Sequence, residues 1–120
     1  GASDYQTAKH AINRLAEYLR AVSGWESMSL FNLVKIGEKH STMSRIFNLR
    51  EGLTAEDDSL PERMFEPLGG GGPSAGNSID KKEFEKAVKT YYTYNLWDQE
   101  GVPTDECLYM HELDWLIGAV

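Results

Sequence analysis

Apolar residues in the first part of this chain recur every three or four positions, which is the spacing of one face of an α-helix. The first such run consists of Ala8, Ile12, Leu15, Leu19 and Val22. Ser3 or Asp4 can cap its start, and Gly24 suits the left-handed conformation that often follows a helix end. Because no segment alternates apolar and polar residues as a half-buried strand does, the pattern predicts an all-α fold.

A second helix is predicted to begin after Ser29, a good capping residue, and to end before Gly52. A glycine within a helix costs about 1 kcal/mol relative to alanine. We therefore expect Gly37 to serve a purpose, the close approach of another helix. The predicted apolar side consists of Leu30, Leu33, Val34, Gly37, Met43, Ile46 and Phe47.

Two more helices are predicted in the second half of the chain. Asp80, with Glu83 at capping-box spacing, opens the third helix, and Thr104 opens the last. The expected buried positions are Phe84, Ala87, Val88, Tyr91 and Leu96 in the third helix and Leu108, Leu113 and Leu116 in the last. The prediction is a compact bundle of about four helices, with a long structured connection and a glycine-rich flexible loop.

The connection between the second and third helices contains two distinct segments. Pro61 suits the first turn of a short helix that Asp58 or Ser59 would cap. The later stretch GGGGPSAGNS, residues 69–78, lacks the Lys-Ser/Thr of a phosphate-binding loop and is predicted to be a flexible loop.

Length and charge limit the possible functions. The 120 residues suit one domain, which we expect to cover residues 4–120, with residues 1–3 as the remnant of a cleaved tag. The formal net charge of −7 disfavours nucleic acid and anionic membrane as partners. A single cysteine, Cys107, excludes a disulfide-built secreted scaffold, so we expect a cytoplasmic protein.

No catalytic, cofactor-binding or metal site is predicted within this chain. The three histidines, His10, His40 and His111, are scattered, and none stands at ligand spacing from Cys107. An EF-hand calcium loop with its glycine at Gly101 would need ligands where Leu96 and Cys107 stand. We therefore expect Cys107 to be a small buried residue.

Five aromatic residues are candidates for an interface or a channel wall: Trp25, Tyr91, Tyr92, Tyr94 and Trp97. The tyrosines can pack a helix interface with their hydroxyl groups at its rim, or they can line a pocket. If they are exposed, the chain can self-associate through them.

Arg50 and Glu51 stand just before Gly52, and Glu51 is unfavourable at a helix C-terminus. We therefore predict a structural brace that consists of Arg50, Glu51, Asp58 and Arg63. In this brace Arg50 binds the carboxylate of Asp57, Asp58 or Glu62, and Glu51 accepts from Arg63 or from exposed N–H groups of the connection.

Several turn motifs recur here in the order and spacing of one known family. They are R-x-x-N-x-R-E-G at residues 45–52, D-D-x-L-P-x-R at 57–63, E-P-L at 66–68 and Y-Y…W-D-x-x-G-x-P-T at 91–104. With these motifs, residues 18–113 resemble the C-terminal part of tungsten-containing aldehyde:ferredoxin oxidoreductases. The glycine run at 69–72, the LWD at 96–98 and the long tail depart from the family pattern and leave open a relative with another substrate, such as an aromatic-acyl reductase.

The resemblance implies that the parent protein oxidises aldehydes to carboxylic acids and passes electrons to ferredoxin. It also implies tungsten or molybdenum on two pterins beside a 4Fe-4S cluster. The family's C-x-x-C-x-x-x-C group is absent here, so this fragment alone is expected to be inactive, to hold no cofactor and to pack against the cofactor-binding domains. The alternative is a stand-alone helical protein-interaction module.

Overall fold

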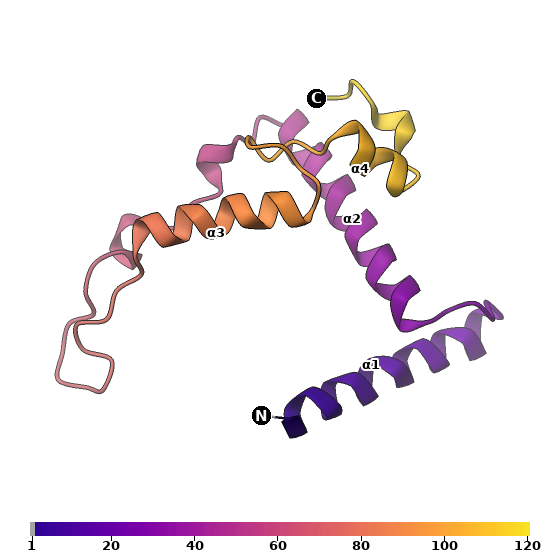
Figure 1. The fold of residues 1–120 in the computed structure, drawn as a ribbon, viewed down its shortest axis with the longest axis horizontal. Coiled ribbons are helices and arrows are strands. Elements are labelled where there is room, and N and C mark those ends of the chain that lie inside the picture. The colour runs from indigo at the N-terminus through magenta and orange to yellow at the C-terminus, as the bar shows by residue number, and fades with distance from the viewer. Residues whose placement is uncertain (1) are drawn as a thin grey trace. The chain divides into compact units, whose positions relative to one another are not determined.

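The computed structural model describes residues 2–120, together with the side chains of residue 8 and residues 10–120. These residues form four α-helices and three short 3₁₀ helices and contain no strand, only an isolated bridge between Trp97 and Pro103 (Figure 1). The predicted all-α class is confirmed. The chain divides into two compact units, Gly1–Ser41 and Thr42–Val120. None of the helices in the described residues is both long enough and apolar enough to cross a membrane.

In the first unit, α1 (Ala2–Ser23) ends as predicted at Gly24, which has a φ of +70°. Arg20 Nη1 donates to the carbonyl oxygen of Met28 at 2.7 Å, and the Met28 side chain is buried. The proposed cap at Ser3 or Asp4 lies outside the described side chains. Four residues of the predicted apolar side are exposed: Ile12, Leu15, Leu19 and Val22.

The second helix, α2 (Leu30–Arg50), has the predicted ends. Ser29 Oγ accepts from the Asn32 amide at 3.3 Å, and Gly52 terminates the helix with a φ of +98°. Of the predicted apolar side only Ile46 is fully buried, together with Thr42 and Arg45, whereas Val34, Met43 and Phe47 are exposed. A Cβ added to Gly37 would meet no atom within 4 Å, so the expected close approach of a helix is not seen among the described residues.

In the second unit, the connection after α2 contains two 3₁₀ turns, η1 (Ala55–Asp57) and η2 (Glu62–Met64). Asp57 Oδ2 accepts from the Thr54 amide at 2.7 Å and so stabilises η1. The helical turn after Pro61 was predicted, but its expected cap by Asp58 or Ser59 is wrong, because η2 has no side-chain cap and the Asp58 carboxylate is bound elsewhere.

The glycine-rich segment forms a loop that projects from the start of α3 (Figure 1). Two backbone hydrogen bonds of Leu68 connect the two ends of this loop. The Leu68 amide donates to Asn77 O, and the Leu68 carbonyl oxygen accepts from the Gly76 amide, both at 2.8 Å.

The last two helices begin at the predicted caps. Asp80 accepts from the Glu83 amide at 2.9 Å to open α3 (Lys81–Tyr94). Thr104 accepts from the Cys107 amide at 3.2 Å to open α4 (Asp105–Met110), and η3 (Asp114–Leu116) follows.

Two clusters of buried side chains form the core of the second unit. One contains Ile46 and the predicted Leu108, Leu113 and Leu116, and the other contains Tyr92, Trp97 and Cys107. Tyr92 is the buried tyrosine of α3, whereas Tyr91 is half exposed. Leu96 lies beyond the end of α3 with a φ of 55°, and this turn leaves its side chain exposed.

Candidate functional site

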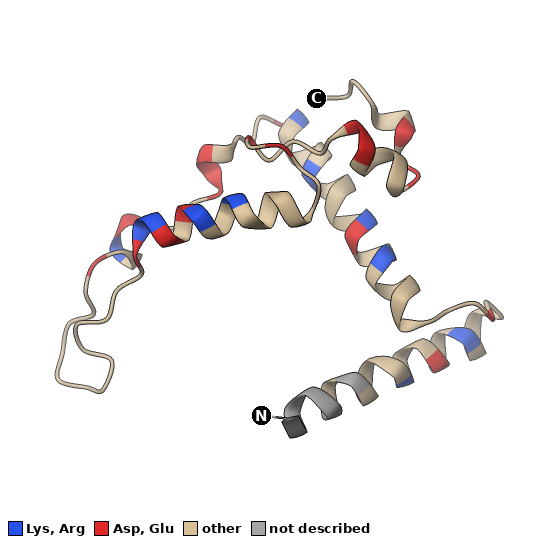
Figure 2. Cartoon of the chain, in the orientation of Figure 1, with Lys and Arg blue, Asp and Glu red and all other residues tan. Residues whose placement is uncertain are grey.

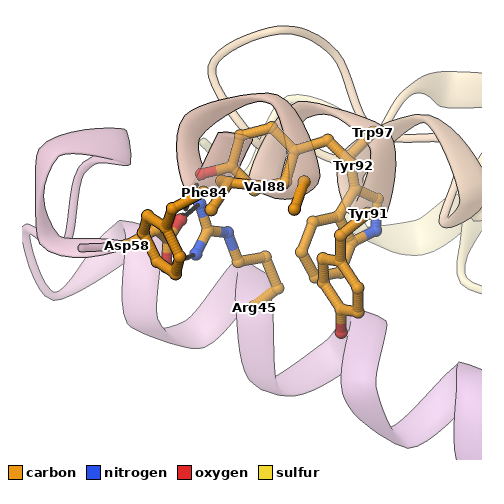
Figure 3. A pocket seen from close by; sticks show the side chains of 8 residues that line it. Arg45, Asp58, Phe84, Val88, Tyr91, Tyr92 and Trp97 are labelled. Atoms are coloured by element: carbon orange, nitrogen blue, oxygen red, sulfur yellow. Dashed lines mark hydrogen bonds and ion pairs between the residues drawn. The ribbon is translucent and has the colours of Figure 1, made fainter. Parts of the chain in front are cut away.

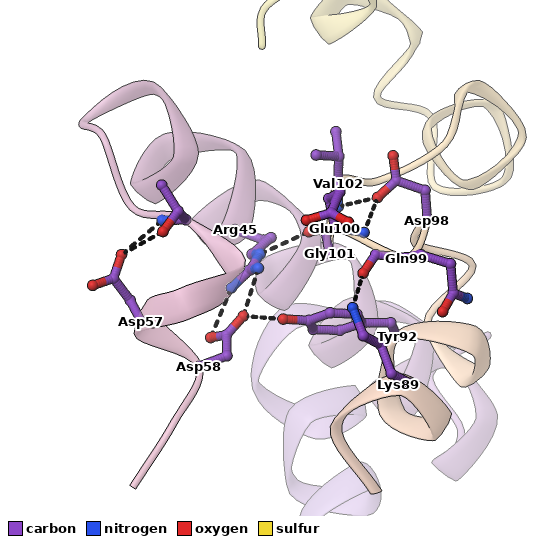
Figure 4. Close-up of polar contacts among 11 residues, drawn as sticks. Arg45, Asp57, Asp58, Lys89, Tyr92, Asp98, Gln99, Glu100, Gly101 and Val102 are labelled. Atoms are coloured by element: carbon purple, nitrogen blue, oxygen red, sulfur yellow. Dashed lines mark hydrogen bonds and ion pairs between the residues drawn. The ribbon is translucent and has the colours of Figure 1, made fainter. Parts of the chain in front are cut away.

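Arg45 is the centre of the polar contacts in the second unit, and only 7% of it is exposed (Figure 4). Its Nε donates to the Gly101 carbonyl oxygen at 2.8 Å, and its Nη1 donates to Asp58 Oδ1 at 3.0 Å. The Nη2 atom lies 2.6 Å from Asp58 Oδ2. One side chain of α2 therefore binds both the connection after that helix and the loop between α3 and α4.

Tyr92 completes this arrangement from α3. Its hydroxyl group donates to Asp58 Oδ2, and its ring centroid lies 5.5 Å from the guanidinium carbon of Arg45. The centroid of the Trp97 ring lies 5.2 Å from the same carbon, so the cation is flanked by two aromatic rings. Such contacts stabilise a buried cation that has lost its hydration.

These contacts shift the pKa values of all three groups. Burial lowers the pKa of Arg45, but the hydrogen bond and charge of Asp58 more than offset this, so the pKa is raised. Burial raises the pKa of Asp58, but the hydrogen bonds from Arg45 and Tyr92 more than offset it, so the pKa is lowered. Burial and then the hydrogen bond to Asp58 raise the pKa of Tyr92 to about 12. The ion pair is therefore charged at neutral pH, and the tyrosine is protonated.

Gly101 allows the close approach of Arg45 and Tyr92. Its φ is +71°, and a Cβ added to it would lie 2.3 Å from Arg45 Nη2 and 2.7 Å from Tyr92 Cζ. Asp98 holds the same loop, since its Oδ1 accepts from the amides of Glu100 and Val102 at 2.8 and 2.9 Å (Figure 4). A side chain at position 101 would displace the guanidinium group.

A cavity of about 440 Å³ lies beside the Arg45–Asp58 pair (Figure 3). Its volume is within the range of small-molecule sites in proteins. Most of the charged residues of α3 lie in the first half of this helix (Figure 2). The side chains that line the cavity are mainly apolar or aromatic: Arg45, Asp58, Phe84, Ala87, Val88, Tyr91, Tyr92 and Trp97.

Two buried side-chain nitrogen atoms in the described part of the chain have no hydrogen-bond partner there, Arg45 Nη2 and Trp97 Nε1. Both belong to residues that line the cavity. Arg45 Nη2 is close to Asp58 Oδ2, but the angles at this contact do not meet those of a hydrogen bond.

Within the described residues, no ion pair or side-chain hydrogen bond joins Arg50, Glu51 or Arg63 as the predicted brace requires. Arg50, Glu51 and Arg63 are exposed, and the Asp58 carboxylate is bound by Arg45 rather than by Arg50. Arg45 faces the buried side of α2 beside Ile46, whereas Arg50 lies at the solvent-exposed end of the helix. Arg45 is not among the site residues predicted from sequence, although it is the first residue of the R-x-x-N-x-R-E-G motif.

The five aromatic candidates fall into two groups. Trp25, Tyr91 and Tyr94 are exposed, at 49%, 52% and 84%, whereas Tyr92 and Trp97 are buried in the second unit. Tyr92 and Trp97 are thus not available for an exposed interface of this chain, because they flank Arg45. Tyr91, Tyr92 and Trp97 line the same cavity. This is the arrangement expected if the tyrosines line a pocket.

The side chains that the structure describes, at residue 8 and residues 10–120, do not fit a metal or iron–sulfur site. The described residues contain no group of three or more His, Cys, Asp or Glu side chains that could hold a metal ion. Cys107 is fully buried, and its Sγ donates to the Asn95 carbonyl oxygen at 3.3 Å. Cys107 is therefore a packed structural residue in this geometry.

Comparison with known proteins gives a consistent result. Residues 4–113 match the family model described as aldehyde ferredoxin oxidoreductase, domains 2 and 3. The chain is 33% identical over 102 residues to the tungsten-containing aldehyde ferredoxin oxidoreductases of Pyrococcus furiosus and Thermococcus kodakarensis. It is 30% identical over 105 residues to the aliphatic sulfonate oxidoreductase, WOR-like subunit, of Pyrococcus furiosus.

The matched regions differ greatly in their share of each protein. They cover 84% of this chain but 14% of each aldehyde ferredoxin oxidoreductase, and 83% of this chain but 17% of the sulfonate oxidoreductase subunit. The chain therefore spans about one seventh of the length of its first relatives and matches their C-terminal part. No solved structure matches the chain.

Proposed function

The chain belongs to the aldehyde ferredoxin oxidoreductase family, and we propose that it is the C-terminal helical domain of a larger oxidoreductase. The observation that carries this proposal is a family match over residues 4–113 that corresponds to a small C-terminal share of each relative. The parent protein would oxidise aldehydes to carboxylic acids and transfer the electrons to ferredoxin in the cytoplasm. Tungsten, or molybdenum, on two pterins and a 4Fe-4S cluster would be bound by other domains.

The role proposed for this chain is structural. Its exposed apolar side chains, such as Leu15, Val22 and Phe47, support an interface with the cofactor-binding domains. In this role Arg45 stabilises the chain itself, because it fixes the connection after α2 and the Gly101 loop of the second unit. The exposed Arg50 is available for contact with another domain of the parent.

We also propose that the cavity contributes to the wall of a substrate channel in the parent protein. Its aromatic side chains Tyr91, Tyr92 and Trp97 are suited to contact an apolar substrate. Membership of the family does not decide the substrate, because one relative is named a sulfonate oxidoreductase and others are named aldehyde oxidoreductases.

The parent gene provides the first test. An upstream segment that encodes the C-x-x-C-x-x-x-C group would support the oxidoreductase, whereas a start and a stop codon flanking these residues would favour a stand-alone interaction module. The purified parent should then contain tungsten or molybdenum together with iron, and it should reduce a viologen dye when an aldehyde is added. If the parent contains these metals but does not oxidise aldehydes, the proposed substrate class is wrong, whereas the proposed structural role of this chain is not contradicted.

A further inference from the structure

We propose that the apolar side of α1 docks onto the remainder of the parent polypeptide, and that α1 opens independently of the second unit when this remainder is absent. The partner rests on the proposed function, because it requires a longer parent protein. The independent opening of α1 does not require one, and it can be tested in this chain alone.

The first unit has almost no apolar core among its described side chains. Its buried apolar residues are Ala16 and Met28, with 3% and 4% of each exposed. Both clusters of buried side chains consist of residues of the second unit. Because burial of apolar surface is the main favourable term in folding, most of this gain belongs to the second unit.

Two polar contacts of α1 are local. Arg20 Nη1 donates to the carbonyl oxygen of Met28 at 2.7 Å, and Ser23 Oγ donates to the carbonyl oxygen of Leu19. Neither contact joins α1 to another helix. In proteins, most of the stability of a helix comes from the packing of its apolar face, so α1 is expected to open more readily than α3.

The apolar side of α1 is suited to such packing but is exposed. Its large aliphatic residues recur at intervals of three and four positions, and all are exposed: Ile12, Leu15, Leu19 and Val22. Residues at this spacing share one face of a helix. Because none of these residues is charged, the face fits a partner that presents an apolar surface.

The choice of partner follows from the family match. This match begins at residue 4, so α1 belongs to the part of the chain that the family shares. The matched region is only 14% of each aldehyde ferredoxin oxidoreductase, so most of the polypeptide of each relative lies outside it. The occupant that we assign to this face is therefore an apolar surface of the corresponding remainder of the parent.

The first experiment is hydrogen exchange in this chain, at a concentration where sedimentation shows a monomer. We expect the amides of α1 to exchange about a hundredfold faster than those of α3, after correction for intrinsic rates. Gly101→Ala should accelerate exchange in α3 and leave exchange in α1 unchanged, because its added Cβ meets residues of the second unit. Gly76→Ala is the matched control, since its added Cβ would meet no atom within 4 Å, and it should accelerate exchange in α3 less. Equal rates in α1 and α3, or equal acceleration of both by Gly101→Ala, would overturn the independent opening.

The second experiment repeats the measurement in the purified parent protein. There the amides of α1 should exchange about a hundredfold more slowly than in this chain. Leu15→Lys should remove this protection, because the lysine would be buried at the contact. Ala21→Lys is the control, since it adds the same charge at an exposed position outside the four aliphatic residues, and it should retain the protection.

The partner is wrong if α1 is as unprotected in the parent as in this chain, or if the two lysine variants have equal effects. Protection that disappears when copies of the parent dissociate on dilution would assign the face to a second copy and would also overturn the partner. A gene that encodes no longer chain would refute the proposed function and the partner together. The exchange rates in this chain alone would still decide whether α1 opens independently.

Discussion

Arg45 and Gly101, which are 56 positions apart in the sequence, are in direct contact through a hydrogen bond of 2.8 Å from Nε to the carbonyl oxygen. The contact requires a residue without a side chain, because a Cβ on residue 101 would lie 2.3 Å from Arg45 Nη2. The loop between α3 and α4 is thus held against α2 by a buried cation.

Gly101→Ala is expected to destabilise the chain by about 3 kcal/mol, because it combines backbone strain with a clash against Arg45 and Tyr92. Urea unfolding measures the loss. The matched control is Gly76→Ala, which has a similar φ of +80° but no atom within 4 Å, and it should cost only about 1 kcal/mol. Equal losses for the two variants would show that the clash is not significant.

Arg45→Ala should be much more harmful than Arg50→Ala. Removal of Arg45 leaves Asp58 without its cation and removes apolar packing beside Trp97, at an expected cost of about 3 kcal/mol. Arg50 is exposed, and its substitution should change stability by no more than about 0.5 kcal/mol. Thermal melts of the two variants under the same conditions measure the two losses of stability. A large loss of stability in Arg50→Ala would support the structural brace that the sequence predicted.

Asp58 should give the chain a specific sensitivity to acid. Its pKa is lowered in the folded chain, so its ionised form contributes stability above the pKa of an unfolded aspartate, near 4. This contribution is lost as the pH falls below about 4 and through the lowered value. The unfolding free energy of Asp58→Asn should therefore be lower than that of the native chain at pH 7, and the difference should shrink below pH 4. Asp57→Asn, at an exposed residue of η1, should retain the acid-dependent loss of the native chain.

The features that could be predicted from sequence are those that depend on local chemistry. Ser29, Asp80 and Thr104 cap the helices that they were expected to cap, because a capping side chain bonds to an amide only two or three positions away. Gly24 and Gly52 end their helices for a similar reason, since both have positive φ angles.

The polar centre of the site could not be predicted in this way. Arg45 binds residues 13 and 56 positions away, and helical periodicity does not report such distant partners. The apolar spacing also could not distinguish side chains that this chain buries, such as Ile46, from those that it leaves exposed, such as Phe47. An apolar face that is exposed here has the same sequence pattern as a face that is packed within its own core.

The purified chain should be folded, mainly helical and colourless, because its described residues provide no group of ligands for a metal or a cluster. Circular dichroism and an absorption spectrum test the first part of this prediction. Elemental analysis tests the second, and iron, tungsten or molybdenum in a stoichiometric amount would contradict it.

The isolated chain should also self-associate through its exposed apolar side chains. Leu15 is 51% exposed on α1, and Leu15→Lys places a charge within the apolar side of that helix. Because a buried lysine would be costly at a contact between copies, the substitution should shift the chain toward monomer. Ala21→Lys is the matched control, since it adds the same charge at another exposed position of α1 without removing a large apolar group. Sedimentation over a range of concentrations measures both variants. A native chain that remains monomeric throughout, or equal shifts in the two variants, would show that this apolar side does not drive association.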